Sequence, residues 1–199
     1  MRFPLDYPLS MSFKVVTFVP QFTIHDANGG LIAYVRQKLF KLKEAVTVFA
    51  DEAQAQPLYT LKADRILDWS ARYDIANAQT GRPLGAVKRE GMKSLWKAHY
   101  NVLNGDRPVY AIRGESVWVN VLDGIFGEIP IIGMFSGYLF HPAYLISRPE
   151  GATVMRLVKQ PAFFEGRFRL DRIEHVAPED EERILLSLVM MVLLERGRG

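Results

Sequence analysis

The chain has 199 residues, of which 49% are hydrophobic and 24% are charged, and its formal net charge is +3. This composition excludes a disordered chain, and the length suits one sizeable domain, which we place over residues 1–199. The small positive charge is far from the strongly basic surface of nucleic-acid-binding proteins, so no nucleic-acid partner is expected. The absence of cysteine excludes disulfides, thiolate metal sites and a cysteine nucleophile.

The N-terminal segment MRFPLDYPLSMSFKVVTFVP lacks the uninterrupted apolar core of a secretory signal peptide. Its apolar residues are interrupted by Pro4, Asp6, Pro8 and Lys14. We therefore expect a cytoplasmic protein. Within this segment, a strand is predicted from Phe13 to Val19.

Five later segments share one pattern, in which two alternating apolar and polar stretches flank a turn that contains Gly, Asn or Asp. This pattern is the strongest short-range signal for a β-hairpin. The five predicted hairpins are Phe22–Lys38, Ala45–Ala63, Tyr73–Glu90, Tyr100–Glu115 and Tyr144–Gln160.

Two further strands are predicted over Ser116–Leu122 and Phe163–Ile173, which brings the total to about a dozen. The segment GMKSLWKA (Gly91–Ala98) fits either a short helical turn or a strand that leads into the Tyr100 hairpin.

A helix is predicted over about residues 178–195. Its apolar run ILLSLVMMVLL (Ile184–Leu194) is interrupted only by Ser187, and Glu179–Glu182 precede it. Carboxylates in the first turn complement the helix dipole, and Pro178 suits the first helical position. The 11-residue run is shorter than the roughly 20 apolar residues needed to span a bilayer, and it has no polar face for lying on one. A helix that is apolar on every face must then be surrounded by protein.

Two arrangements could surround this helix. A sandwich of two sheets would leave half of the helix exposed, and it therefore predicts polar positions that the helix lacks. An antiparallel barrel of roughly twelve strands is wide enough to hold a helix, which is about 10–12 Å across with its side chains. We favour the mainly β fold, a barrel of about twelve antiparallel strands that encloses the C-terminal helix.

These segments resemble the tubby C-terminal-like superfamily, specifically its LURP-one-related and phospholipid scramblase branch. The similar pieces are FTIHDANGGLIAYVRQKLFKLKEAVTVFAD, YDIANAQTGRPLGAVKRE, and FFEGRFRLDR with the apolar helix that follows. The resemblance runs from about Gln21 to Leu194 and implies a twelve-stranded barrel wrapped around a C-terminal hydrophobic helix, in agreement with the preceding argument.

The resemblance implies different activities in different branches. Tubby-like domains bind phosphoinositide headgroups through Lys and Arg on the barrel surface, and scramblases respond to calcium through an acidic loop before the final helix. Here that segment, FFEGRFRLDRIEHVAPEDEE, contains Arg167, Arg169 and Arg172 and lacks the alternating Asp/Asn ladder that calcium needs. The cysteine-rich segment of animal scramblases is also missing, so calcium-dependent scrambling is not expected.

Cations gather after two of the predicted strands. Arg36 and Lys38 alternate along a strand and would share one face; if their strand neighbours that of Lys88, the cations form one patch for an anionic phospholipid headgroup. In the competing interpretation, these residues only keep strand exteriors soluble and protect sheet edges. The candidate headgroup residues are Arg36, Lys38, Lys41, Lys43, Lys88, Arg89, Lys93 and Lys97.

The segment LDGIFGEIPIIGMFSGYLF (Leu122–Phe140) is apolar but contains four glycines and Pro130, so it is too broken to span a bilayer. It is either a protruding loop that contacts a membrane or a partner, or a connection that closes one end of the barrel over the helix.

No pattern in the chain indicates catalysis. The four histidines lie far apart, and the sequence has no GxSxG, Walker A or GxGxxG motif. We expect a non-enzymatic barrel without cofactor or metal that binds anionic phospholipid headgroups peripherally. The alternative is a protein-interaction module, self-associating through residues 122–140.

Overall fold

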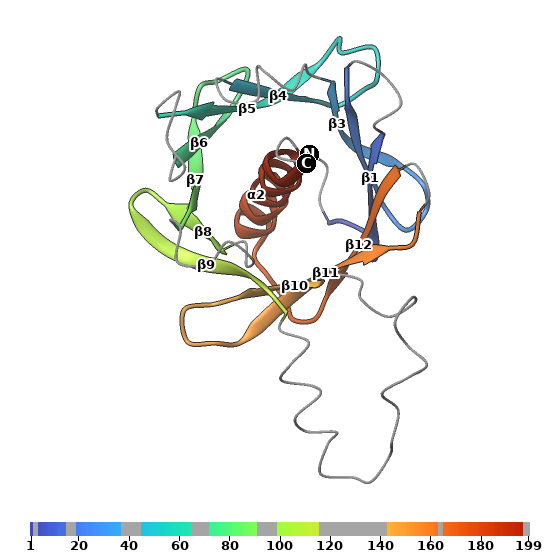
Figure 1. Cartoon of the computed structure of the whole chain (residues 1–199). Helices are drawn as coiled ribbons and strands as arrows, with labels where there is room; N and C mark the ends of the chain where they lie inside the picture. Colours follow the sequence, from blue (N-terminus) through green and yellow to red (C-terminus); the bar gives the residue numbers. More distant parts are fainter. Residues whose placement is uncertain are drawn as a thin grey trace, which may run out of the picture.

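Twelve antiparallel strands close into a barrel around a C-terminal helix in the part of the chain that the computed structural model describes (Figure 1). The described residues are 1, 4–14, 19–36, 45–64, 72–90, 99–115, 143–162 and 165–196. The strands are β1 (Leu9–Lys14), β2 (Gln21–His25), β3 (Leu31–Arg36), β4 (Ala45–Phe49), β5 (Pro57–Ala63), β6 (Arg72–Asn77), β7 (Pro83–Arg89), β8 (His99–Asn104), β9 (Arg107–Gly114), β10 (Ala143–Ser147), β11 (Thr153–Gln160) and β12 (Glu165–Arg172). The helix is α2 (Pro178–Arg196).

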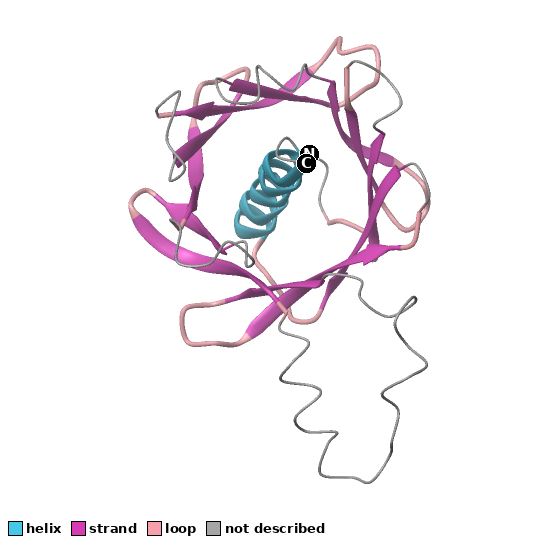
Figure 2. Cartoon of the chain, viewed as in Figure 1, coloured by secondary structure: helices cyan, strands magenta, loops and turns pink. Residues whose placement is uncertain are grey.

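Each strand pairs with its neighbours in the sequence, and β1 also pairs with β12, which closes the barrel. Figure 2 shows the resulting ring of strands with the helix inside it. Closure gives every described strand a partner on both sides, although β3 and β4 pair only at Tyr34 and Phe49 among the described residues. The predicted mainly β fold, a barrel of about twelve strands around the C-terminal helix, is confirmed.

The direction of the strands defines two ends of the barrel. Arg82, in the β6–β7 turn, contacts Glu179 in the first turn of α2, whereas Tyr100 on β8 contacts Glu195 in its last turn. We call the end at which α2 begins the proximal end and the other the distal end. Because the pairing is antiparallel throughout, every odd-numbered strand runs from the proximal to the distal end.

The core of the protein is the space between the barrel wall and α2. From Ile184 to Leu193, every residue of α2 is at most 2% exposed, Ser187 included. Inward residues such as Met11, Phe22 and Ile24 belong to the same buried cluster. The predicted helix over about 178–195 is thus confirmed, as is its enclosure by protein.

All five predicted hairpins are present, as β2–β3, β4–β5, β6–β7, β8–β9 and β10–β11. Two of the turn glycines show why glycine at these positions predicts a turn. Gly29 and Gly81 have φ angles of 82° and 71°, a backbone conformation that residues with a Cβ rarely adopt.

The predicted N-terminal strand is wrong in its position. It was expected over Phe13–Val19, but β1 spans Leu9–Lys14 and Val19 lies in a bend, while residues 15–18 lie outside the described residues. Leu9, Met11 and Phe13 alternate inward, and Leu9 and Met11 face Leu170 and Phe168 of β12 across the ladder. This non-local pairing decided the register. The segments Ser116–Leu122 and Gly91–Ala98 lie outside the described residues, whereas the strand predicted over Phe163–Ile173 corresponds to β12.

Within the described ranges, no helix combines the length and the apolar character that crossing a bilayer requires.

Leu188 tests whether α2 is the core of the barrel. Its side chain is fully buried, so Leu188→Lys should prevent folding, because an unpaired charge would be buried. Leu188→Ala should lower the free energy of unfolding by about 2–5 kcal/mol, and the control Leu188→Met by less than about 1.5 kcal/mol. Urea unfolding followed by circular dichroism measures all three. A soluble Leu188→Lys protein with near wild-type melting would contradict the enclosed helix.

Candidate functional site

Cations mark the distal end of the barrel. Each of the six odd-numbered strands has Lys or Arg as its last or second-to-last residue. Because all odd-numbered strands finish at the distal end, these residues are distributed around it. They are Lys14, Arg36, Lys62, Lys88, Arg113 and Lys159.

Four of these cations are exposed on the outer surface and are available to a ligand. Lys14, Arg36, Lys62 and Lys88 are exposed, and none of them forms an ion pair with another described residue. We call these four residues the distal cations. Arg113 is also on the outside, but it is paired with Glu90 at 3.3 Å.

Two of the distal cations belong to one row across three strands. Gln21 of β2 pairs with Lys14 of β1 on one side and with Arg36 of β3 on the other. Neighbouring strands lie about 4.8 Å apart, which places the two cation backbones about 10 Å from each other. Long side chains can cover half of this distance each. Lys14, Gln21 and Arg36 together therefore offer two positive charges and an amide to a single phosphate group.

The structure separates the candidates that were predicted together. Arg36 and Lys88 both lie exposed at the distal end, but a single patch required their strands to be neighbours. Three strands, β4 to β6, stand between β3 and β7. Lys62 of β5 lies in this interval. Lys38, Lys41, Lys43, Lys93 and Lys97 lie outside the described residues, as does the segment 122–140.

Arg89, a further candidate, does not belong to the outer surface. Strand alternation turns its side chain inward, where it is 17% exposed. Its guanidinium carbon lies 6.0 Å from the centre of the Tyr100 ring, and a terminal nitrogen lies 3.9 Å from the Glu195 carboxylate. The Tyr100 hydroxyl donates to the same carboxylate at 2.7 Å. Arg89 thus helps to hold the last turn of α2.

Lys14 and Lys62 were missed as candidates because each is an isolated cation in the sequence. The signal that could have revealed them is their position. Each ends an alternating stretch of the kind that also ends in Arg36 and Lys88, and strands that alternate in direction bring such ends together.

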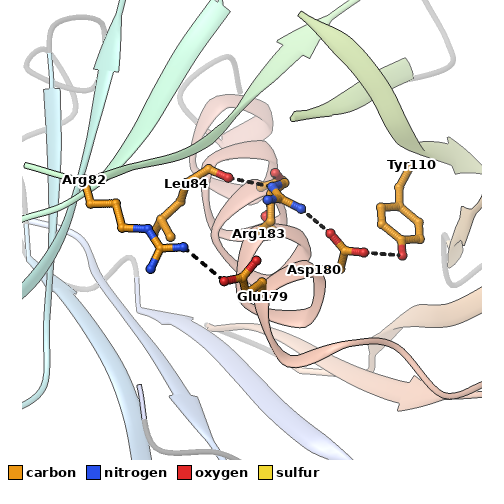
Figure 3. Close-up of polar contacts among 7 residues, drawn as sticks. Arg82, Leu84, Tyr110, Glu179, Asp180 and Arg183 are labelled. Carbon is orange, nitrogen blue, oxygen red and sulfur yellow. Dashed lines mark hydrogen bonds and ion pairs between the residues drawn. The ribbon is translucent and has the colours of Figure 1, made fainter. Parts of the chain in front are cut away.

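The proximal end has a different polar arrangement, in which the carboxylates of the first turns of α2 bind separate parts of the wall. The Arg82 guanidinium lies 3.0 Å from the Glu179 carboxylate (Figure 3). The Arg172 guanidinium lies 3.2 Å from Glu181, and the Tyr59 hydroxyl donates to Glu182. These contacts fix α2 to the β6–β7 turn, to β12 and to β5.

Arg183 is a buried member of this arrangement, 5% exposed, as is Glu181 at 2%. Its Nε donates to the backbone carbonyl of Leu84 at 2.6 Å, and a terminal nitrogen pairs with Asp180. The Tyr110 hydroxyl donates to the other oxygen of Asp180 at 3.0 Å, as Figure 3 shows. The group connects α2 to β7 and β9.

Burial raises the pKa of Tyr59, and the hydrogen bond to Glu182 raises it further. Burial and the Asp180 carboxylate likewise raise the pKa of Tyr110. Both phenols therefore remain protonated as donors to carboxylates. Because both hydroxyls already donate to carboxylates of α2, their role is to hold the helix in position.

Gly85 allows the Arg183 side chain to approach the barrel wall. Its φ is +146°, and a Cβ there would lie 2.2 Å from the Leu103 carbonyl oxygen and 2.7 Å from the Arg183 Nε. The backbone oxygen cannot move aside cheaply, so only glycine fits at this position.

The sequence model of the LURP-one-related family matches residues 31–124, which confirms the family resemblance from β3 through β9. The X-ray structure of a protein from Arabidopsis thaliana is similar, with a TM-score of 0.48 and 17% identity over 96% of this chain and 92% of that one. None of the curated proteins matches the chain at a significant level.

Arg183 and Arg82 form a matched pair for testing the fastening of α2. Arg183→Met removes the partner of Asp180 and of a backbone carbonyl, so it should lower the free energy of unfolding by about 2–3 kcal/mol. Arg82→Met breaks an ion pair in which both side chains are about two-thirds exposed, and it should cost less than about 1 kcal/mol. Urea unfolding of both variants gives the comparison; equal losses would show that the buried contact has no special role.

Gly85→Ala should destabilise the protein by more than about 3 kcal/mol, because its Cβ overlaps a backbone oxygen at a positive φ. The control is Gly114→Ala, since a Cβ there would have no atom of a described residue within 4 Å. Differential scanning calorimetry should show a large fall in melting temperature for the first variant and little change for the second. Similar melting temperatures would be incompatible with the close approach of Gly85 to Leu103.

Proposed function

We propose, from the LURP-one-related match and the closed barrel, that this protein is a non-enzymatic, cytoplasmic protein that binds anionic phospholipid surfaces peripherally. The observation that carries the proposal is the set of distal cations, which are exposed at one end of the barrel and form no ion pair with another described residue. A barrel that is filled by its own helix must bind such a surface from outside.

The strength of such binding can be bounded. Each Lys or Arg near an anionic membrane contributes about 1 kcal/mol, so the four distal cations contribute about 4 kcal/mol together. This supports reversible binding rather than permanent anchoring. Because the Debye length is about 8 Å at physiological ionic strength, the binding should weaken with added salt.

The position of these cations favours binding over general solubility. Protection of sheet edges does not explain Lys14, Lys62 and Lys88, because each of them pairs with a neighbouring strand on both sides. Asp6, Asp26 and Glu52, which have no described ion pair, lie at the proximal end, whereas Glu165 is in register with Lys14 at the distal end. This polarity favours an end-on approach, with the distal end toward the anionic surface.

The row of Lys14, Gln21 and Arg36 is the part of this surface best suited to a single headgroup. Lysine and arginine can both donate to phosphate oxygens, and the Gln21 amide between them can donate a further hydrogen bond. We propose this row as the first contact site. Lys62 and Lys88 would add electrostatic attraction to the anionic surface but would not bind the same headgroup.

Co-sedimentation with vesicles tests the proposal. Wild type should sediment with vesicles of phosphatidylcholine and phosphatidylserine but not with phosphatidylcholine alone, and less so as salt is added. The double variant K14Q/R36Q should bind roughly thirtyfold more weakly, the effect of losing about 2 kcal/mol. Arg107→Gln is the matched control, because Arg107 is exposed at the proximal end. Equal sedimentation with both vesicle types, or an equal loss with Arg107→Gln, would refute end-on binding.

The same protein samples address the alternative, self-association through residues 122–140. Static light scattering would then show an oligomer that is lost when this segment is shortened. Vesicle binding in that case would not depend on Lys14 and Arg36.

A further inference from the structure

A pocket of about 650 Å³ lies at the proximal end, on the other side of the barrel from the distal cations. It is formed by the N-terminal segment, the β2–β3 turn and the β4–β5 turn, together with the first residues of β3 and β5. Its volume is within the range of about 300–1,000 Å³ that is typical of small-molecule sites.

The lining of the pocket combines an apolar wall with negative charge. Leu5 is buried, and Leu31, Ile32 and Leu58 are half-buried, so they form the side toward the barrel. Asp6 is exposed and therefore lies toward solvent. An apolar ligand body would remove surface from water on the inner side and leave a polar group near the carboxylates.

The two carboxylates in the lining keep acceptor capacity. Asp26 Oδ1 accepts from the backbone amides of Asn28 and Gly30 at 2.9 and 2.7 Å, and Asp6 Oδ2 accepts from the Asn28 side chain at 3.0 Å. Neither carboxylate forms an ion pair with any residue that the structure describes. Each therefore retains an oxygen for a further donor.

The charge of the described residues around the pocket favours a cation. Asp51 and Glu52 adjoin the lining residue Ala50 in the β4–β5 turn and add to the negative potential. The Met1 amino group does not neutralise Asp6 or Asp26, because it contacts the Tyr59 hydroxyl at 2.6 Å and lies 3.9 Å from Glu182. An anionic ligand would be repelled, and a neutral apolar one would leave the carboxylates unused.

We propose that this pocket binds an organic ammonium group carried on an apolar chain. The apolar chain of the ligand packs against Leu31, Ile32 and Leu58, and its ammonium group lies between Asp6 and Asp26. A free alkylamine and a lysine side chain of a peptide present the same chemistry. Because the pocket and the distal cations are at opposite ends, this binding is independent of the proposed membrane contact.

Titration monitored by ¹H–¹⁵N NMR tests the proposal with four probes: hexylammonium, hexanol, hexanoate and the peptide acetyl-Leu-Lys-Leu-amide. Hexylammonium or the peptide should shift the amides of Gly30, Leu31 and Ala50, whereas hexanol and hexanoate should not. Response to hexylammonium identifies a free amine as the ligand type, and response to the peptide alone identifies a lysine side chain. Equal response to hexanol, or no response to any probe, would overturn the proposal.

Two variants separate the contributions of charge and shape. Asp6→Asn keeps the shape of the side chain and should weaken the binding of hexylammonium about two- to fivefold, which is the effect of losing one partly exposed ion pair. Ala50→Trp should block the pocket and abolish binding. Glu150→Gln, in the β10–β11 turn at the same end, is the control and should leave affinity unchanged. If Ala50→Trp does not fold, Asp6→Asn against Glu150→Gln still decides, because equal affinities would exclude Asp6 from the site.

Discussion

The burial of a helix that is apolar on every face is the constraint on which the rest of this structure depends. A helix with one apolar stripe can lie on a sheet, but α2 has no side that can face water between Ile184 and Leu193. It requires a continuous wall, and a wall of β-strands is continuous only when it closes. The burial of α2 therefore requires β1 to pair with β12, in addition to any preference of the two strands for each other.

Enclosure also organises the polar groups. The carboxylates that suit the start of a helix are brought to one end of the barrel, where Asp180, Glu181 and Glu182 find partners on the wall. The strands that run toward the other end finish in cations. Because α2 fills the interior of the barrel, other molecules can bind only at its two ends or on its outer surface.

The parts that could be predicted from the sequence are those fixed by local chemistry. The hairpins follow from alternation and from glycines such as Gly29 and Gly81, and α2 follows from its apolar run and its acidic first turn. Non-local pairing accounts for what was missed. The position of β1 depends on β12, the separation of Arg36 from Lys88 depends on the closed strand order, and the row of Lys14 with Arg36 exists only through β2.

The order of the elements along the chain has a consequence for synthesis. The barrel closes when β1 pairs with β12, which lies more than 100 residues later in the chain. During translation, β12 is therefore made long after β1 has left the ribosome. The other strand pairings join neighbours in the sequence, so the pairing of β1 with β12 carries the largest loop-closure cost. The most hydrophobic segment, α2, follows all twelve strands in the sequence. Exposed hydrophobic surface makes folding intermediates prone to aggregation. Translating α2 after the strands shortens the time in which it lacks an enclosing wall.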